Sequence, residues 1–235
     1  MRFDILTIFP EVFDSVLKIS VIGKAVEAGL IEINAVDIRQ FSENKHRKVD
    51  DYPYGGGSGM VMMAQPIYSA YMSIVKGLTK KPKVIYMTPQ GIPLTQAHAT
   101  MYSGYGHVIV LCGHYEGIDE RLLDEIVDEE ISIGDYVLTG GELPAMVFID
   151  AVSRAIPGVL SSEESYLVET HANGLLEYPQ FTRPVDFNGR RVPEVLLSGH
   201  HLKIAEWRMK ESLLCTRKKR PDMYKKYELA DKEKQ

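Results

Sequence analysis

Apolar residues along this chain follow two alternating spacings. Short runs rich in β-branched residues predict strands at residues 3–9, 31–36, 83–87, 108–112 and around 131–133. Between these runs, apolar residues recur at the spacing of a helix that packs one face against a core. The alternation of strand and helix predicts an α/β fold with a parallel sheet.

The expected helices are marked by their apolar positions and by proline and glycine. Pro10 suits the first position of a helix and Gly29 suits its end, so we expect one helix between them. Its apolar residues recur at helical spacing and are Val12, Phe13, Val16, Leu17 and Ile19. Further helices are expected around Ile67 and Tyr71, over residues 119–127, and from Pro144 onward.

Three of the predicted strands end in polar or glycine-bearing loops. The strand at 83–87 is followed by Thr88-Pro89-Gln90-Gly91, the strand at 108–112 by Gly113, and the strand near 131–133 by Gly134. In open α/β sheets, ligands bind where the carboxyl ends of the strands meet. We therefore expect one pocket at these three strand ends, lined by backbone amides and carbonyls that suit a flat heterocycle such as adenine.

A long polar segment, residues 39–60, contains the glycine-rich run Gly55-Gly56-Gly57-Ser58-Gly59. A nucleotide-binding P-loop requires Lys-Ser or Lys-Thr after its last glycine, but Met60 and Val61 follow here. The dinucleotide-binding pattern fails as well, because Met62 stands where its third glycine would be. A mobile surface loop is the simple alternative, but a loop of this length is more often a functional lid or binding loop.

Composition limits the class of protein. With 235 residues, of which 45% are apolar, the chain can form one large domain or a large and a small one. Cys112 and Cys215 form no CxxC pair, so neither a disulfide framework nor a zinc site is indicated, and we expect a cytoplasmic protein without a metal site of its own. No segment has the roughly 18 consecutive apolar residues of a spanning helix, and the N-terminus does not resemble a signal peptide.

Charge is distributed unevenly around a net value of -5. Residues 182–226 contain 12 Lys and Arg against 5 Asp and Glu, which indicates a polyanion-binding segment on an acidic body. Residues 201–214 predict an amphipathic helix with Ile204, Trp207, Leu213 and Leu214 on its packed side. The run Arg217, Lys218, Lys219 and Arg220 is the candidate for phosphate contacts, and a solvated basic helix is the alternative.

Five motifs carry a resemblance to a known family. They are YPYGGG from Tyr52, CGHYEGIDER from Cys112, ISIGDYVLTGGELPAM from Ile131, GLLEYPQFTRP from Gly174 and VLLSGHH from Val195. In this order they resemble the bacterial TrmD-type tRNA (guanine-N1)-methyltransferases of the SPOUT superfamily, and the match covers essentially the whole chain. The resemblance implies methyl transfer from S-adenosylmethionine to N1 of guanosine 37 in tRNA, by a homodimer whose cofactor lies in a trefoil knot. Periodicity and spacing do not indicate a knot.

The resemblance also implies which residues line the cofactor site. These are Tyr86, Pro89, Gly113, Tyr115, Glu116, Gly117, Ile133, Gly134, Asp135, Tyr136, Val137, Leu138, Gly140 and Gly141. Glycines suit such positions because a Cβ atom would hold the backbone away from the ligand.

Two residues are expected to carry the chemistry. N1 of guanine must lose a proton to a base, and the negative charge that spreads to O6 must be stabilised. The resemblance assigns the charge stabilisation to Arg154, for which an ordinary helix-surface pair with Asp150 is the alternative. For the base it points to Glu169, at a position where relatives have aspartate. Glu164 and His171 are the two rivals.

The expected organisation is a knotted methyltransferase domain at 1–160, a flexible linker at 161–173 and a helical tRNA-binding domain at 174–235. Members of the family depend on Mg²⁺, and we expect any such ion to contact substrate oxygens too. Two other functions stay open: methyl transfer to another RNA position, and a non-catalytic RNA-binding protein with the same fold.

Overall fold

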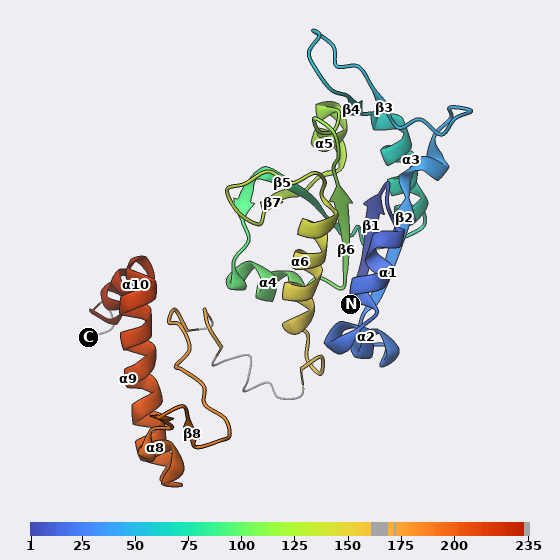
Figure 1. The fold of residues 1–235 in the computed structure, drawn as a ribbon. Coiled ribbons are helices and arrows are strands. Elements are labelled where there is room, and N and C mark those ends of the chain that lie inside the picture. The colour runs from blue at the N-terminus through green and yellow to red at the C-terminus, as the bar shows by residue number, and fades with distance from the viewer. Residues whose placement is uncertain (161–168, 172, 233–235) are drawn as a thin grey trace. The chain divides into compact units, whose positions relative to one another are not determined.

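The computed structural model describes residues 1–160, 169–171 and 173–232, and the chain divides into two compact units, residues 1–161 and 162–235 (Figure 1). The first unit is built on a five-stranded sheet in the order β2-β1-β6-β5-β7, in which every neighbouring pair is parallel. The strands are β1 (Arg2–Thr7), β2 (Glu32–Asp37), β5 (Lys83–Pro93), β6 (His107–Cys112) and β7 (Glu129–Ser132). The expected α/β fold with a parallel sheet is confirmed.

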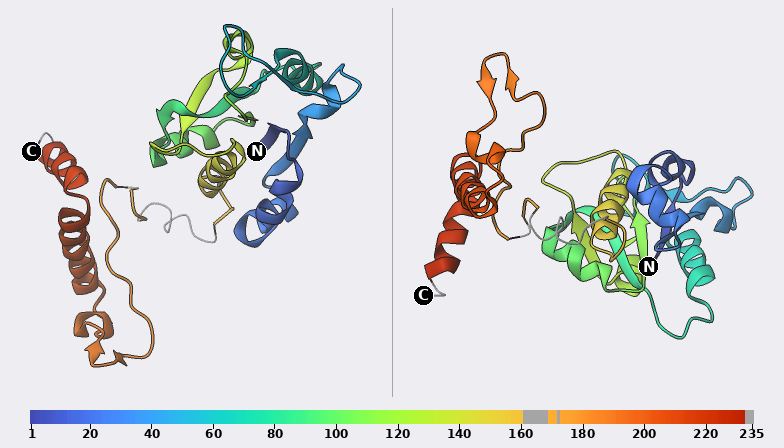
Figure 2. Two further views of the ribbon diagram at one scale, coloured as in Figure 1. Left: turned by 45° about the horizontal axis from the view of Figure 1, so that its top comes forward. Right: turned by 90° about the horizontal axis from the view of Figure 1, so that it is seen from below.

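Helices cover both faces of this sheet. The helices of the first unit are α1 (Glu11–Leu17), α2 (Ser20–Glu27), α3 (Ala64–Val75), α4 (Gln96–Ser103), α5 (Glu120–Ile126) and α6 (Glu142–Arg154), with a 3-10 turn η1 (Ile38–Phe41). Figure 2 shows α3 and α6 on opposite sides of the sheet. Side chains of β6 alternate between two cores: Val108 and Val110 pack with α1 and α6, whereas Ile109 and Leu111 pack with α3 and α5. Burial on both faces explains why this strand reads as an unbroken apolar run.

The region between the first two strands differs from the prediction. The single helix expected from Pro10 to Gly29 is two helices, because Ile19 is extended and Ser20 has a φ of 56°. Gly23 allows the turn to be tight, since a Cβ there would lie 2.4 Å from the carbonyl oxygen of Lys18. Of the expected apolar face, Phe13 and Leu17 are buried in the core, whereas Val12, Val16 and Ile19 are exposed, so the predicted packed face is confirmed in part.

Strand β5 also differs, since it does not stop at Met87. It continues to Pro93 with a shift of register against β7 between Met87 and Ile92. Gly91 permits the shift, because a Cβ atom there would lie 2.4 Å from the backbone of Glu130. The residues expected to form a loop after Met87 are therefore an irregular part of the strand.

A short antiparallel pair lies outside the large sheet. It consists of β3 (Asp50–Asp51) and β4 (Val61–Met62), and the glycine-rich run lies between them.

The second unit is mainly helical. It contains α8 (Glu194–Leu197), α9 (His201–Lys219), α10 (Pro221–Lys232) and a hairpin of β8 (Asp186–Phe187) and β9 (Arg190–Arg191). Trp207 lies edge-on to Tyr178 and close to Phe181, with ring centroids 6.4 and 6.2 Å apart, which agrees with a packed position.

One residue of α9 was assigned to the wrong face. Leu214 was expected on the packed side but is 49% exposed, while Ser212 and Thr216 are buried. The buried hydroxyl of Thr216 has two hydrogen-bond partners. It donates to the carbonyl of Ser212 at 2.6 Å and accepts from the amide of Leu176 at 2.8 Å.

Within the described part of the chain, no helix has both the length and the apolar character needed to cross a membrane.

Candidate active site

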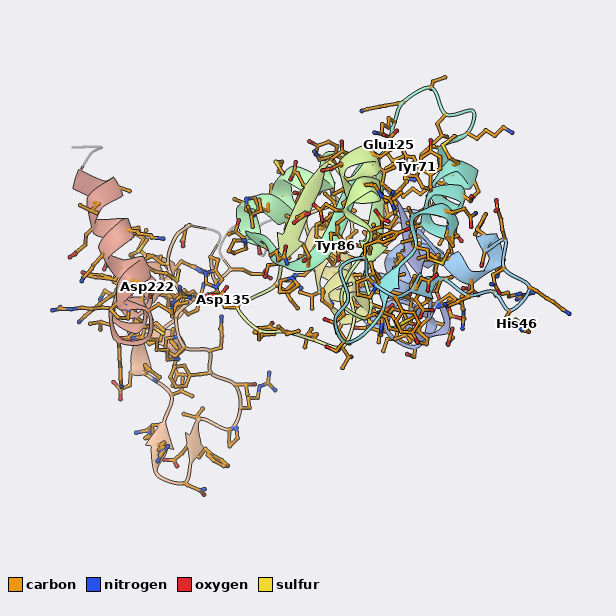
Figure 3. All side chains as sticks on the ribbon, turned by 90° about the horizontal axis from the view of Figure 1, so that it is seen from above. His46, Tyr71, Tyr86, Glu125, Asp135 and Asp222 are labelled. Carbon is orange, nitrogen blue, oxygen red and sulfur yellow. The ribbon has the colours of Figure 1, made fainter. Side chains whose placement is uncertain are left out.

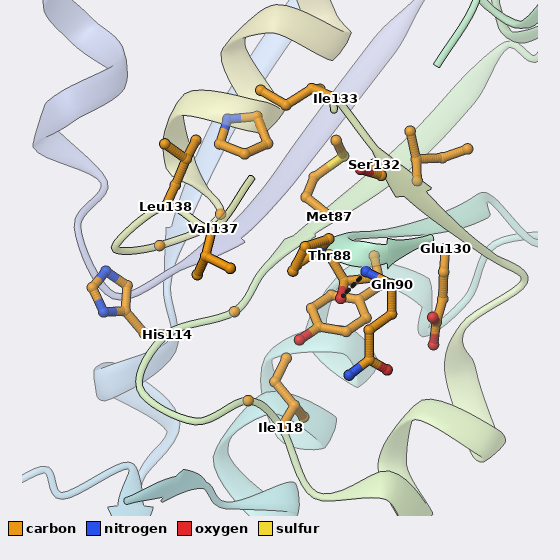
Figure 4. A pocket seen from close by; sticks show the side chains of 18 of the residues that line it. Met87, Thr88, Gln90, His114, Ile118, Glu130, Ser132, Ile133, Val137 and Leu138 are labelled. Atoms are coloured by element: carbon orange, nitrogen blue, oxygen red, sulfur yellow. Dashed lines mark hydrogen bonds between the residues drawn. The ribbon is translucent and has the colours of Figure 1, made fainter. Parts of the chain in front are cut away.

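A cavity of about 300 Å³ lies where β6 and β7 end and where β5 changes register after Met87 (Figure 4). These three strands are neighbours in the parallel sheet, so their ends meet at one edge. The start of α6 completes the wall through Gly140, Gly141 and Pro144. The convergence of three strand ends that the sequence predicted is therefore confirmed.

The predicted cofactor residues are brought together at this cavity, with one exception. Those that line it are Tyr86, Pro89, Gly113, Tyr115, Glu116, Gly117, Ile133, Gly134, Tyr136, Val137, Leu138, Gly140 and Gly141. Asp135 is exposed on the same loop and is not among the lining residues.

Tyr86 forms the part of the wall that separates the cavity from the core. Figure 3 shows it among the side chains of the first unit, and burial raises the pKa of its hydroxyl to about 12. The hydroxyl consequently keeps its proton near neutral pH and can donate a hydrogen bond. Gly113 faces it, since a Cβ there would lie 2.7 Å from the Tyr86 oxygen.

The turn before α6 packs directly on the end of β6. The amide of Gly141 donates to the carbonyl of Gly113 at 2.9 Å, and Gly140 forms an antiparallel bridge with His114. A Cβ at Gly141 would lie 2.7 Å from the Cα of Cys112. Glycine is needed here because the neighbouring group is backbone, which cannot move aside cheaply.

A buried polar cluster under this turn was not predicted from the sequence. Glu142, only 7% exposed, accepts a hydrogen bond from the hydroxyl of Thr7 at 2.8 Å, and its other oxygen lies 3.5 Å from Nε2 of His114. The cluster connects the end of β1, the loop after β6 and the start of α6. One feature of the sequence could have indicated this cluster. Glu142 directly follows Gly140 and Gly141 at the start of a helix, and the first turn of a helix favours negative charge.

The glycine-rich segment reaches the rim of the cavity. The amide of Met62 donates to the carbonyl of Gly117 at 2.9 Å, and the amide of Glu116 donates to the carbonyl of Met60 at 3.0 Å. Glu116 and Gly117 both line the cavity. The segment after the glycines is therefore joined to the cavity wall.

The cavity lining within this chain does not include the two proposed catalytic residues. Arg154 is half-buried at the last position of α6, so the helix rise of about 1.5 Å per residue puts it roughly 18 Å along the axis from Glu142. Glu169 is half-buried in the second unit. Of its rivals, Glu164 lies outside the described residues, and His171 is exposed with a φ of 74°.

The basic run occupies the end of α9. Arg217, Lys218 and Lys219 are exposed, whereas the guanidinium of Arg220 pairs with Asp222 at 2.6 Å. Among the residues that the structure describes, no three His, Cys, Asp or Glu side chains gather where they could hold a metal ion.

Comparison with known proteins agrees with this geometry. A family model described as tRNA (Guanine-1)-methyltransferase TrmD matches residues 1–226. The chain is 65% identical to the tRNA (guanine-N(1)-)-methyltransferase of Ruminiclostridium cellulolyticum, over 96% of this chain and 97% of that protein. The proteins of the same name from Clostridioides difficile and Lachnospira eligens are 57% and 56% identical, covering 96% and 97% of this chain and 98% and 96% of their own lengths. The resemblance carried by the five motifs is confirmed, and the chain belongs to the tRNA (Guanine-1)-methyltransferase TrmD family.

Proposed function

We propose that this chain transfers the methyl group of S-adenosylmethionine to N1 of guanosine 37 in tRNA, giving 1-methylguanosine and S-adenosylhomocysteine. The observation that carries the proposal is the family match over residues 1–226. The cavity at the ends of β5, β6 and β7 supports it, because it gathers the residues that the family resemblance assigns to the cofactor.

The character of the cavity fits this methyl donor. Glu116, Glu120 and Glu130 line it, and its lining within the described residues includes no lysine or arginine. S-adenosylmethionine carries a positive sulfonium and a positive ammonium group, so an acidic lining favours it. Apolar side chains such as Ile133 and Leu138, with the backbone at Gly113 and Gly141, supply a surface for the adenine ring.

The chemistry divides between the donor and two residues of the protein. The bound donor supplies an electrophilic methyl group. Glu169 accepts the N1 proton of the target guanine, and Arg154 stabilises the negative charge that develops at O6. An arginine suits this role because it stays protonated and presents several donors in a plane. Any Mg²⁺ contacts substrate oxygens as well as protein.

A homodimer with composite sites explains the position of Arg154. The residue lies at the far end of α6 from the cavity of its own chain, which supports a role at the cavity of a second chain. Two adjacent helices offer a surface for such a partner, because Val12 and Val16 of α1 and Leu143 and Val147 of α6 are exposed. Exposed apolar groups gathered on neighbouring helices are typical of subunit interfaces.

The chain around the cavity is proposed to form the trefoil knot of the family. Support comes from the segment after β7, which returns to the end of β6 through the bond between Gly141 and Gly113 before α6 packs on β1 and β6. For the RNA, the helical second unit supplies phosphate contacts through Arg217, Lys218, Lys219 and Arg220. Exposure of the first three supports this role.

The test is transfer of a labelled methyl group to tRNA transcripts that have or lack guanosines at positions 36 and 37. The proposal expects transfer only where position 37 is guanosine. Transfer that is independent of this base indicates another RNA position, and binding of tRNA without any transfer indicates a non-catalytic protein.

A further inference from the structure

Two tyrosines between β3 and β4 lie in solvent. Residues 52–60, here called the glycine loop, include Tyr52 and Tyr54, whose exposed fractions are 78% and 99%. The loop extends beyond the labels β3 and β4 at the top of Figure 1. Rings exposed to this extent leave their faces open, and a planar ligand that stacked on them would remove apolar surface from water.

The glycine loop is anchored to the cavity wall. Besides the bonds at Met60 and Met62, the amide of Asp119 donates to the carbonyl of Met62 at 3.1 Å. Gly59 has a φ of 86°, and a Cβ atom there would lie 2.3 Å from Oε1 of Glu116, a residue of the cavity lining. The end of the loop at Gly59 and Met60 is therefore fixed beside the cavity wall, and the loop that carries the two tyrosines starts from there.

Glycines also shape the rest of the loop. Gly55, Gly56 and Gly57 all have positive φ values, between 81° and 131°, which other residues adopt only with strain. This backbone keeps the segment after Tyr54 turned and without bulky side chains. A flat ligand can consequently approach the tyrosine rings without a steric barrier from their own chain.

Positive charge accompanies the exposed rings. The turn at residues 45–48 carries Lys45, His46, Arg47 and Lys48, and His46 lies at an outlying edge of the first unit in Figure 3. Lys48 joins this turn to the start of the loop through an ion pair with Asp51 at 3.2 Å. Lys48 is therefore already paired, and Lys45 and Arg47 are the exposed cations of this turn. Proteins that bind single-stranded RNA combine aromatic rings that stack on bases with cations that contact the phosphates along the strand.

We propose that Tyr54, assisted by Tyr52, stacks on an unpaired nucleobase of the RNA substrate next to the methylated nucleotide, while the turn at 45–48 contacts phosphate. The inference rests on the proposed function, which supplies RNA as the occupant. It assigns part of substrate recognition to the first unit, in addition to the basic run of the second.

The test compares Tyr54→Ala, Tyr54→Leu and Tyr54→Phe in the full-length protein. Affinity for a tRNA transcript is measured directly by fluorescence anisotropy with S-adenosylhomocysteine present, and KM and kcat are measured by methyl transfer. We expect Tyr54→Ala and Tyr54→Leu to weaken tRNA binding roughly tenfold, because one base stack is lost. Tyr54→Phe keeps the ring and is expected to stay within about twofold of wild type. Tyr68→Ala, a change at a 40% exposed tyrosine on α3, is the matched control and is expected to change nothing.

Two results would overturn the inference. One is wild-type tRNA affinity in Tyr54→Ala. The other is an equal loss of S-adenosylmethionine binding measured by calorimetry without RNA, because the loop would then act only on the cavity wall. Failure of the proposed function gives a different result: the wild-type protein binds tRNA without methylating it, and the affinity ratio between Tyr54→Ala and Tyr54→Phe still decides the role of the ring.

Discussion

Thr7 and Glu142 are 135 residues apart in the sequence, yet the Thr7 hydroxyl donates a hydrogen bond of 2.8 Å to the Glu142 carboxylate in a buried site. Thr7 is the last residue of β1 and Glu142 the first of α6. The bond therefore holds the helix start, and with it Gly140 and Gly141 of the cavity wall, against the edge of the sheet.

Replacing Thr7 by valine should lower both stability and cofactor affinity. The variant keeps the shape of the side chain but leaves a buried carboxylate without one of its donors, which costs about 1–3 kcal/mol of unfolding free energy. Cofactor binding is expected to weaken severalfold because the turn before α6 loses its support. Urea unfolding and calorimetric titration measure the two effects. Thr7→Ser retains the hydroxyl and serves as the control; equal stability of the valine variant and wild type would show that the bond contributes nothing.

Replacing the cavity glycines should weaken cofactor binding, because the new Cβ atom collides with neighbouring protein atoms as well as with the ligand. In Gly141→Ala the new Cβ meets the backbone at Cys112 at 2.7 Å, so the turn must move and S-adenosylmethionine binding should fall at least tenfold. In Gly113→Ala the neighbour is the Tyr86 hydroxyl at 2.7 Å, a group at the end of a side chain that can shift, and a smaller loss is expected. Gly106→Ala is the control, because a Cβ there meets nothing within 4 Å. Calorimetry giving the same affinity for all three variants would contradict this order.

Acid should destabilise the first unit partly through Asp4. Burial by itself would raise the pKa of this carboxyl, but hydrogen bonds from Arg2, Asn34 and His107 outweigh burial and hold the pKa below its ordinary value of 3.8. Because the folded-state pKa is the lower one, the stability that Asp4 contributes is present above the unfolded-state value and is lost as the pH falls through the folded-state value.

The matching variant is Asp4→Asn. It removes a buried carboxylate whose partner Arg2 is 41% exposed, so solvent weakens the pair. We expect a loss of about 1–2 kcal/mol of unfolding free energy near neutral pH, with a smaller further loss in acid than wild type. Urea unfolding at neutral pH, and at pH values from above to below the ordinary Asp pKa of 3.8, measures the loss at neutral pH and the further loss in acid. Parallel acid profiles for variant and wild type would mean that Asp4 does not contribute to the acid response.

If the site is composite, as proposed, activity should recover when two inactive variants are mixed. Arg154→Ala and Glu169→Gln should each be nearly inactive alone. If the two residues of one site come from different chains, a mixed dimer has one site with both changes and one with neither. Methyl transfer should then return after subunit exchange. Continued inactivity with exchange demonstrated by mass spectrometry would place both residues in one chain.

The sequence predicted the elements that short-range patterns determine. Buried strands such as β6 were evident because both of their faces are apolar, and the cavity followed from the rule that parallel strands end at one edge. The sequence did not predict the break between α1 and α2, because apolar residues keep their helical spacing up to Ile19. The helical backbone conformation is nevertheless interrupted there, since Ser20 has a positive φ. The extension of β5 depends on the close approach of Gly91 to Glu130, which only tertiary structure reveals.

In the candidate active site, too, local motifs were predictable from the sequence and contacts between distant residues were not. The glycines of the cavity were recognisable from two of the five motifs, whereas the hydrogen bond between Thr7 and Glu142 joins residues that no local pattern relates. The position of Arg154 away from its own cavity depends on the length of α6, which the sequence suggested only in outline.

Identification of the methylated nucleoside shows which atom of which nucleotide receives the methyl group. The full-length protein is incubated with S-adenosylmethionine and a tRNA transcript with guanosine at positions 36 and 37, and the RNA is digested and analysed by mass spectrometry. The account predicts 1-methylguanosine at position 37 in a single-turnover reaction, and a rate about 10²–10⁴-fold lower for Glu169→Gln with cofactor and tRNA binding retained. Methylation at another nucleotide, or an unchanged rate for Glu169→Gln beside an inactive Glu164→Gln, would contradict it.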